Sequence, residues 1–123
     1  MTATLTRDSV LSMPAGREMD VLVAELVMGW LVKDGCYYSN GVVTPWMTPE
    51  HWGDYQGFRP SEDIAAAWEV VEKLWETHNY AVEGCNGSQF ALFQSKDKSF
   101  SCHGLTAPLA ICRAALLTTL GDV

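Results

Sequence analysis

Apolar residues recur at helical spacing in the first part of the chain. Between Ala15 and Gly29 they lie three and four positions apart, which places them along one face of an amphipathic helix. The predicted apolar stripe is Met19, Leu22, Val23, Leu26, Val27 and Trp30. Upstream, Thr6 is well placed to cap a short helical turn that ends at Pro14. Residues 1–14 are therefore predicted to be an N-terminal arm or a short helix.

A second amphipathic helix is predicted after Ser61. Ser61 is the expected N-cap, and Asp63 falls in the first turn, where a negative charge is favourable. The predicted apolar face is Ile64, Ala67, Trp68, Val71, Leu74 and Trp75, and the acidic side is Glu62, Glu69, Glu72 and Glu76. Trp68 and Trp75 are therefore expected in the core.

Alternating and β-branched patterns predict strands around these helices. The stretch WLVKDGCYYS reads as a hairpin about Asp34-Gly35, and Asn40-Gly41 is a second turn signal. Residues 79–85, 88–94 and 98–103 form three runs with short connections, which indicates an antiparallel meander. The middle run is apolar on both faces, so both faces of this sheet are expected to be covered.

The last predicted helix is apolar nearly all round. It begins after Thr106, and Arg113 is the only charged residue between Ala107 and Leu120. Such a helix needs partners on more than one side. We expect the sheet to cover one side and a second subunit another, which predicts a homo-oligomer.

Together these elements predict an α+β fold in one domain spanning residues 1–123. Their order is helix, two strands, helix, three strands, helix. The expected architecture is an antiparallel sheet of about five strands, made of the hairpin and the three-strand meander, sandwiched between helices. A chain of 123 residues suits one such domain.

Composition and charge narrow the possible partners. The net charge of -7 argues against non-specific binding to DNA or RNA, whose phosphates require a basic surface. The N-terminus lacks the pattern of a signal peptide, and no apolar run reaches the ~18 residues that a membrane span needs. A cytosolic protein without membrane contact is therefore expected.

The cysteines are predicted to be small buried hydrophobes. They are Cys36, Cys85, Cys102 and Cys112. No pair has the short spacing of a zinc knuckle or a redox motif. The less favoured alternative is a metal site that uses Cys102, His103 and a distant partner, so no metal is predicted.

Several blocks of the chain resemble the phage ABA sandwich domain family. They are MPAGREMDVLVAELVMGW, KDGCYYS, SEDIAAAWEVVEKLWE and TAPLAICRAALL. The resemblance runs from about Ser9 to Leu120. It implies a protein of a phage or prophage, a helix–sheet–helix sandwich, and a location in the cytoplasm of the infected bacterial host. It implies no reaction and no functional residues, and the region from Gly41 to Pro60 matches no motif of the family.

That region, a predicted long aromatic loop over residues 41–60, contains the stretch TPWMTPEHWGDYQGFRP. Aromatic faces stack on nucleobases, and an arginine matches a phosphate. The candidate ligand-binding residues are Trp46, His51, Trp52, Tyr55, Phe58 and Arg59. Further charge or base-reading groups are expected from Lys96, Lys98, Arg113, Asn86 and Gln89 if they come close. The alternative is that these aromatic rings cap the sheet or a subunit contact.

Catalytic motifs are absent. The chain has no G-x-x-x-x-G-K loop and no G-x-S-x-G elbow, and His51, His78 and His103 lie in no metal-binding pattern. We therefore expect no enzyme activity and no cofactor.

The favoured hypothesis is a phage accessory protein that sequesters a nucleotide-derived immune signal, of the cyclic oligonucleotide or cyclic ADP-ribose type. The alternatives are an acidic protein that inhibits a host factor and a structural or accessory phage protein without a ligand.

Overall fold

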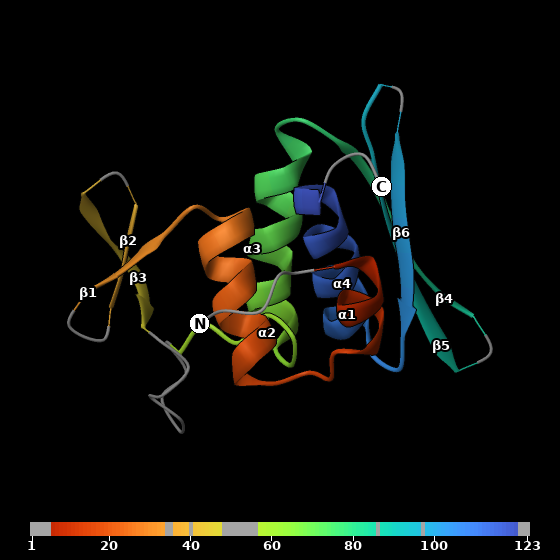
Figure 1. The fold of residues 1–123 in the computed structure, drawn as a ribbon, viewed down its shortest axis with the longest axis horizontal. Coiled ribbons are helices and arrows are strands. Elements are labelled where there is room, and N and C mark those ends of the chain that lie inside the picture. Colours follow the sequence, from red (N-terminus) through yellow and green to blue (C-terminus); the bar gives the residue numbers. More distant parts are fainter. Residues whose placement is uncertain are drawn as a thin grey trace.

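Two antiparallel sheets lie on either side of a central layer of helices (Figure 1). The computed structural model describes residues 6–33, 36–39, 41–47, 57–85, 87–96 and 98–120. The helices are α1 (Arg7–Ser12), α2 (Arg17–Leu22), the π-helix η1 (Val23–Val27), α3 (Ile64–Trp75) and α4 (Ala107–Leu120). The strands are β1 (Leu31–Lys33), β2 (Cys36–Ser39), β3 (Val42–Met47), β4 (Asn79–Cys85), β5 (Ser88–Gln94) and β6 (Ser99–Gly104).

The α+β class and the approximate order of elements are confirmed, but the single sheet of about five strands is not. The strands form two antiparallel three-stranded sheets, in the orders β1-β2-β3 and β4-β5-β6. The helices lie between the two sheets, so the hairpin cannot extend the meander (Figure 1). The predicted layer order, one sheet between helices, is therefore replaced by one helical layer between two sheets. We call β1-β2-β3 the small sheet and β4-β5-β6 the large sheet.

Strand β3 was not expected, because it lies inside the predicted aromatic loop. Val42 pairs with Ser39, which agrees with the turn predicted at Asn40-Gly41, although Asn40 is outside the described residues. Gly41 has a φ of 81°, which suits glycine. The register shifts where Pro45 occurs, as expected for a residue without an N–H group. The proline is therefore accommodated at an irregularity and does not prevent the strand.

The hairpin between β1 and β2 follows the prediction. Lys33 pairs with Cys36, so two residues connect the strands, and those two residues, Asp34 and Gly35, lie outside the described chain. Tyr37 on β2 is fully buried. This side chain attaches the small sheet to the helical layer.

The first long helix changes its winding midway. Met28 N–H donates to Val23 O, a π-type bond, and Gly29 ends the helix with a φ of 73°. Met19, Val23 and Val27 are buried as predicted, whereas Leu26 is 48% exposed. The wider turn rotates the last residues of the helix, and an ordinary helical wheel therefore misplaces Leu26.

Helix α3 buries a face that is rotated from the predicted one, toward Ala66 and Val70 and away from Ile64. Asp63, not Ser61, is the N-cap, and its carboxylate accepts the Ala65 N–H at 3.1 Å. The buried face consists of Ala66, Ala67, Val70, Val71 and Leu74. Trp68 and Trp75 are 41% and 64% exposed, so their predicted core positions are wrong. Their rings contact Tyr80 on β4, at centroid distances of 5.7 and 6.2 Å.

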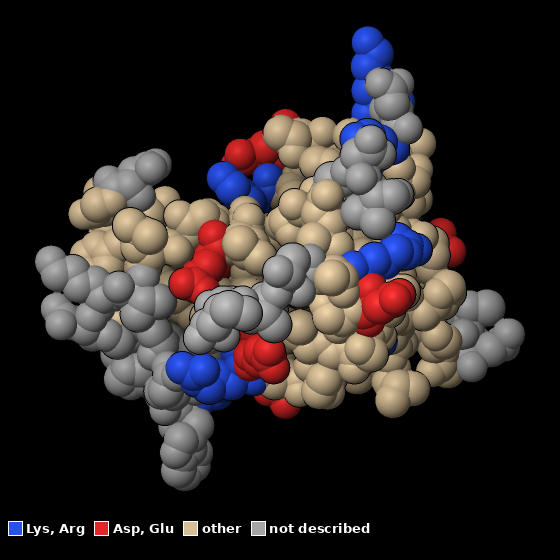
Figure 2. Space-filling view, in the orientation of Figure 1, with Lys and Arg blue, Asp and Glu red and all other residues tan. Residues whose placement is uncertain are grey.

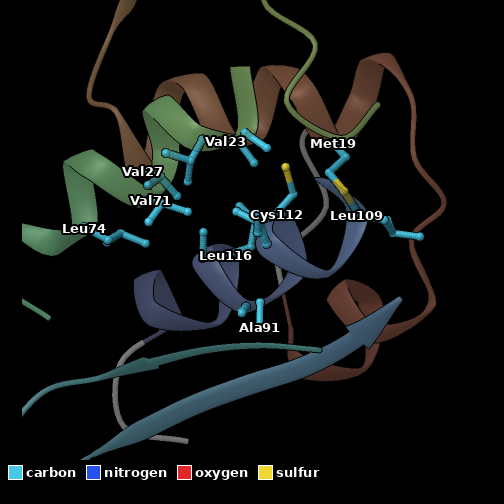
Figure 3. Close-up of a cluster of buried hydrophobic side chains, with 14 of the residues drawn as sticks. Met19, Val23, Val27, Val71, Leu74, Ala91, Leu109, Cys112 and Leu116 are labelled. Carbon is cyan, nitrogen blue, oxygen red and sulfur yellow. The ribbon is translucent and has the colours of Figure 1, made fainter. Parts of the chain in front are cut away.

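Helix α4 is the centre of the core. It packs on β5 and β6 on one side and on α3 and η1 on the other. Figure 3 shows Cys112 and Leu116 of α4 among side chains from α2, η1, α3 and β5. The all-round apolar character of α4 is thus satisfied within one subunit. The apolar surface of α4 therefore requires no second subunit, and the oligomeric state stays a prediction.

The large sheet is covered on one face. Ala91, Phe93, Phe100 and Cys102 point toward α4 and are buried. The residues that alternate with these along the strands, including Phe90 and Leu92, point to the outer face. No helix of the described chain packs on that face (Figure 1). The prediction that both faces are covered is therefore not met within the described part of one subunit.

Candidate ligand pocket at the corner of α3 and β4

The predicted ligand-binding residues divide into three groups. Phe58 is fully buried, with its ring 4.8 Å from Trp30 and 6.1 Å from Tyr37 between centroids. It packs in the interior and offers no face to a ligand, which agrees with the alternative in which such rings belong to the core. Arg59 is partly buried, and its carbonyl oxygen accepts the N–H groups of Glu62 and Asp63 just before α3.

The other members of the predicted group are not described. His51, Trp52 and Tyr55 lie outside the described residues, and so does the side chain of Trp46, whose backbone belongs to β3. Their role in ligand binding stays a prediction.

The structure shows a pocket in a different place, where α3 runs into β4 beside the turn between β5 and β6. Its volume is about 460 Å³, within the usual range for small-molecule sites. It is lined by Trp75, Glu76, Thr77, His78, Asn79, Gln94, Ser95 and Lys96. We call this the corner pocket. Figure 2 shows Lys and Arg side chains at the end of the molecule where the β5–β6 turn lies.

Local hydrogen bonds build the walls of the corner pocket. The N–H groups of Thr77 and His78 both donate to Leu74 O, at 2.9 and 2.7 Å, and turn the chain from α3 into β4. On the other side, Ser95 N–H donates to Lys98 O at 2.9 Å and closes the β5–β6 turn. The pocket is therefore formed by two chain reversals that meet at one end of the large sheet.

The side chains of the corner pocket suit an anion with a flat ring. Trp75 is 64% exposed, and the edge contact with Tyr80 restrains its indole. Lys96 is exposed and supplies a positive charge. His78 Nδ1 and Thr77 Oγ1 are hydrogen-bonded at 2.8 Å, so a ligand would meet the imidazole through Nε2.

Two amides and one carboxylate complete the pocket. Asn79 and Gln94 are cross-strand partners and place two amides side by side. Glu76 is the only carboxylate among the lining residues, and it pairs with Lys73 at 3.7 Å. This surface ion pair is weak, but it reduces the repulsion between Glu76 and an anionic ligand.

The pocket also contains a hydroxyl–imidazole pair. Thr77 Oγ1 and His78 Nδ1 are hydrogen-bonded, and the described lining includes no carboxylate that is hydrogen-bonded to this imidazole. Among the described residues, no group of three or more His, Cys, Asp or Glu side chains is arranged to hold a metal ion. Cys102 and Cys112 are buried as predicted, and burial raises the pKa of both thiols.

The sequence indicated Lys96 as a possible ligand contact but did not indicate Trp75, the aromatic residue of the corner pocket. Lys96 was a predicted source of charge, whereas Trp75 was placed in the core. The signal for Trp75 was the run of Ala and Val on α3, which is small enough to form a complete buried face without it. Arg113 does not line the pocket and instead donates to Met13 O and His103 O. Asn86 lies outside the described residues, so its role stays a prediction. Gln89 packs against Gly84 at the opposite end of the strands.

Two antiparallel sheets on either side of a helical layer define an α+β sandwich. The family model of the phage ABA sandwich domain matches residues 21–116. The chain therefore belongs to the phage ABA sandwich domain family, as the sequence blocks predicted.

A crystal structure of a phage protein from Bacillus cereus ATCC 14579 has a similar fold. The TM-score is 0.64 at 23% identity, over 85% of this chain and 92% of that one. At this identity the similarity shows the fold alone. No curated protein matches the chain. No helix in the described part of the chain has the length and apolar character to span a membrane.

Proposed function

We propose that this phage protein binds a small nucleotide-derived anion in the corner pocket without transforming it. In the cytoplasm of an infected bacterium, such a protein would sequester a cyclic oligonucleotide or a cyclic ADP-ribose type signal and so counteract anti-phage defence. The observation that carries the proposal is the exposed indole of Trp75 beside Lys96 and His78 in one pocket of about 460 Å³.

The base and the phosphate of a nucleotide each have a counterpart in this pocket. Stacking of a base on an aromatic ring contributes about 1–3 kcal/mol, and Trp75 supplies such a ring. The ammonium group of Lys96 suits a phosphate, since charge-assisted hydrogen bonds are the stronger ones. Asn79 and Gln94 each carry a donor and an acceptor, which suit the polar edge of a base.

The acidic side of α3 gives less support to the alternative of a protein that inhibits a host factor. Glu62, Glu72 and Glu76 are exposed, but Lys73 interrupts them and pairs with Glu76. The modest net charge of -7 is also a weak imitation of nucleic acid. The corner pocket therefore supports a small ligand better than a macromolecular target.

The proposal is tested by thermal unfolding with a panel of cyclic dinucleotides, cyclic trinucleotides and cyclic ADP-ribose isomers. A ligand at a hundred times its dissociation constant stabilises the fold by about 2.7 kcal/mol, which raises the melting temperature measurably. Ligand recovered after heat denaturation is expected to be chemically intact, whereas an enzyme would return an altered compound. A flat response across the panel would contradict the proposal and favour the protein-binding or structural alternatives.

A matched pair of variants locates the site. Trp75→Ala is expected to abolish the thermal shift. Trp68→Ala removes a similar exposed indole from the same helix and is expected to preserve the shift, because Trp68 does not line the pocket. Trp52→Ala tests the aromatic segment separately. Loss of binding in Trp52→Ala alone would move the site from the corner pocket to that segment.

A further inference from the structure

The outer face of the large sheet has an apolar centre that the described chain leaves uncovered. Phe90 and Leu92 on the central strand β5 point outward and are only partly buried. Beyond the end of β6, two positions after the outward-facing His103, Leu105 is 83% exposed and extends the apolar surface beside this face. A face of this kind on an antiparallel sheet is a candidate for packing against another sheet.

A carboxylate and an imidazole lie on opposite sides of this centre. Glu83 on β4 pairs with Phe90, and Phe90 pairs with His103 on β6, so the three residues form one row across the sheet. Glu83 and His103 are both exposed, and they lie on opposite sides of Phe90. The His103 ring lies 4.9 Å from the Phe90 ring, measured between centroids. The carboxylate of Glu83 therefore lies at the β4 edge of the face, and the imidazole of His103 lies at the β6 edge.

We propose that a second copy of the chain packs on this face, related by a two-fold axis parallel to the strands. This rotation places β4 of one copy over β6 of the other. Glu83 then faces the partner's His103, and the same pair recurs on the other side of the axis. Phe90 and Leu92 meet their own counterparts at the centre. The interface is self-complementary, as a two-fold contact requires, and resembles aligned packing of two sheets about 10 Å apart.

The carboxylate of Glu83 and the imidazole of His103 favour this axis over the other simple choice, because an imidazole N–H can donate a hydrogen bond to a carboxylate. A two-fold axis perpendicular to the strands would place β4 over β4 and β6 over β6. Glu83 would then lie over β4 of the partner and His103 over β6, so that no carboxylate would meet an imidazole. Electrostatic complementarity of this kind fixes the register of an interface and disfavours wrong arrangements.

The arrangement also bears on the corner pocket. Asn79 and Gln94 line the pocket and belong to the same outer face, in a row with Ser99 of β6. A second copy in the proposed orientation brings its β6 edge over this row and covers the sheet side of the pocket. This consequence rests on the proposed function, whereas the interface itself does not.

The interface is tested on the full chain without any ligand, by sedimentation equilibrium and light scattering. We expect a dimer for the unmodified protein and a monomer for Leu92→Asp and for Leu105→Asp. Leu105 is exposed, so its variant folds even if Leu92→Asp does not. Trp68→Ala, on α3, is the control and is expected to remain a dimer. Circular dichroism melts establish that each variant is folded.

A charge exchange tests the pairing itself. Glu83→Arg and His103→Glu are each expected to weaken the dimer roughly tenfold, and the double variant is expected to recover most of the loss. A monomer at every concentration, a dimer that resists both Leu92→Asp and Leu105→Asp, a dimer broken by Trp68→Ala, or single-variant losses that the double variant does not recover would overturn the proposal. A monomer that still shows the ligand-induced thermal shift would overturn the interface and leave the proposed function standing.

Discussion

The carboxylate of Asp20 accepts the backbone N–H of Ser61 in the protein interior, with 2.8 Å between Oδ1 and N. Ser61 Oγ in turn accepts the Gly16 N–H at 3.0 Å. The start of α2 is thus joined to the segment that leads into α3. Ser61 serves this long-range contact, which explains why Asp63 caps α3 in its place.

Burial makes the side chain of Asp20 a weaker acid than usual. Only 1% of the residue is exposed, and Oδ2 has no hydrogen-bond partner among the described residues. Desolvation raises the pKa of Asp20 from 3.8 to about 6, partly offset by the hydrogen bonds from Ser61. Nearby charges act more weakly, since Glu62 raises the pKa and Arg59 lowers it.

This pKa predicts a loss of stability as the pH rises. Between about pH 4 and pH 6 the folded state retains the Asp20 proton while the unfolded state has lost it. The contribution of Asp20 to the free energy of unfolding therefore falls across this range, by up to about 3 kcal/mol, and is level above it. Urea unfolding at a series of pH values measures the change.

Asp20→Asn isolates the effect, because the amide oxygen still accepts the Ser61 N–H. The variant is expected to match the unmodified protein near pH 4 and to exceed its free energy of unfolding above pH 6. Asp63→Asn is the control, since asparagine also caps a helix and this position is less buried. Parallel pH profiles for Asp20→Asn and the unmodified protein would show that Asp20 carries no such penalty.

Phe58 is expected to be essential to the attachment of the small sheet. Its ring packs between Trp30 and Tyr37 with no exposed surface. Phe58→Ala is expected to lower the free energy of unfolding by about 3–5 kcal/mol, because it leaves a cavity there. Urea unfolding is the measurement, and Trp75→Ala, which removes an exposed ring, is expected to cost far less. Similar losses in the two variants would contradict the burial of Phe58.

Gly104 is expected to tolerate no side chain. A Cβ at this position would lie 2.9 Å from the backbone nitrogen of Ala110, at the start of α4. Gly104→Ala must therefore push the helix away from β6, at a cost of about 1–3 kcal/mol in the free energy of unfolding. At Gly84 a Cβ would meet only the flexible Gln89 side chain, at 3.0 Å, so Gly84→Ala is a milder control. Equal stability of Gly104→Ala and the unmodified protein would show that α4 can shift freely.

The features that the sequence predicted well are local. Thr6 forms a capping box with Ser9, and the pairing of Lys33 with Cys36 follows from the Asp34-Gly35 signal. The meander β4-β5-β6 likewise follows from short connections. Each of these depends on residues a few positions apart, whose conformational preferences act within the segment itself.

The features that the sequence did not predict depend on distant contacts. The separation of the two sheets results from how the helices pack between them. The exposure of Trp75 depends on α4 filling the other side of α3 with a face of small residues. The corner pocket joins α3 to the β5–β6 turn about twenty positions later in the chain, and no local pattern indicates that these segments meet.

Lys96 is expected to carry the electrostatic part of ligand binding in the corner pocket. Lys96→Gln keeps a polar side chain, one atom shorter, but removes the charge. It is therefore expected to weaken binding of a phosphate-bearing ligand roughly tenfold and to reduce the salt dependence of the dissociation constant. Lys98→Gln removes a charge from the same turn without altering the pocket lining and serves as the matched control. Isothermal titration at two salt concentrations distinguishes the variants. Equal losses in both would indicate a general effect of net charge, because only a lysine inside the pocket acts on the ligand at short range.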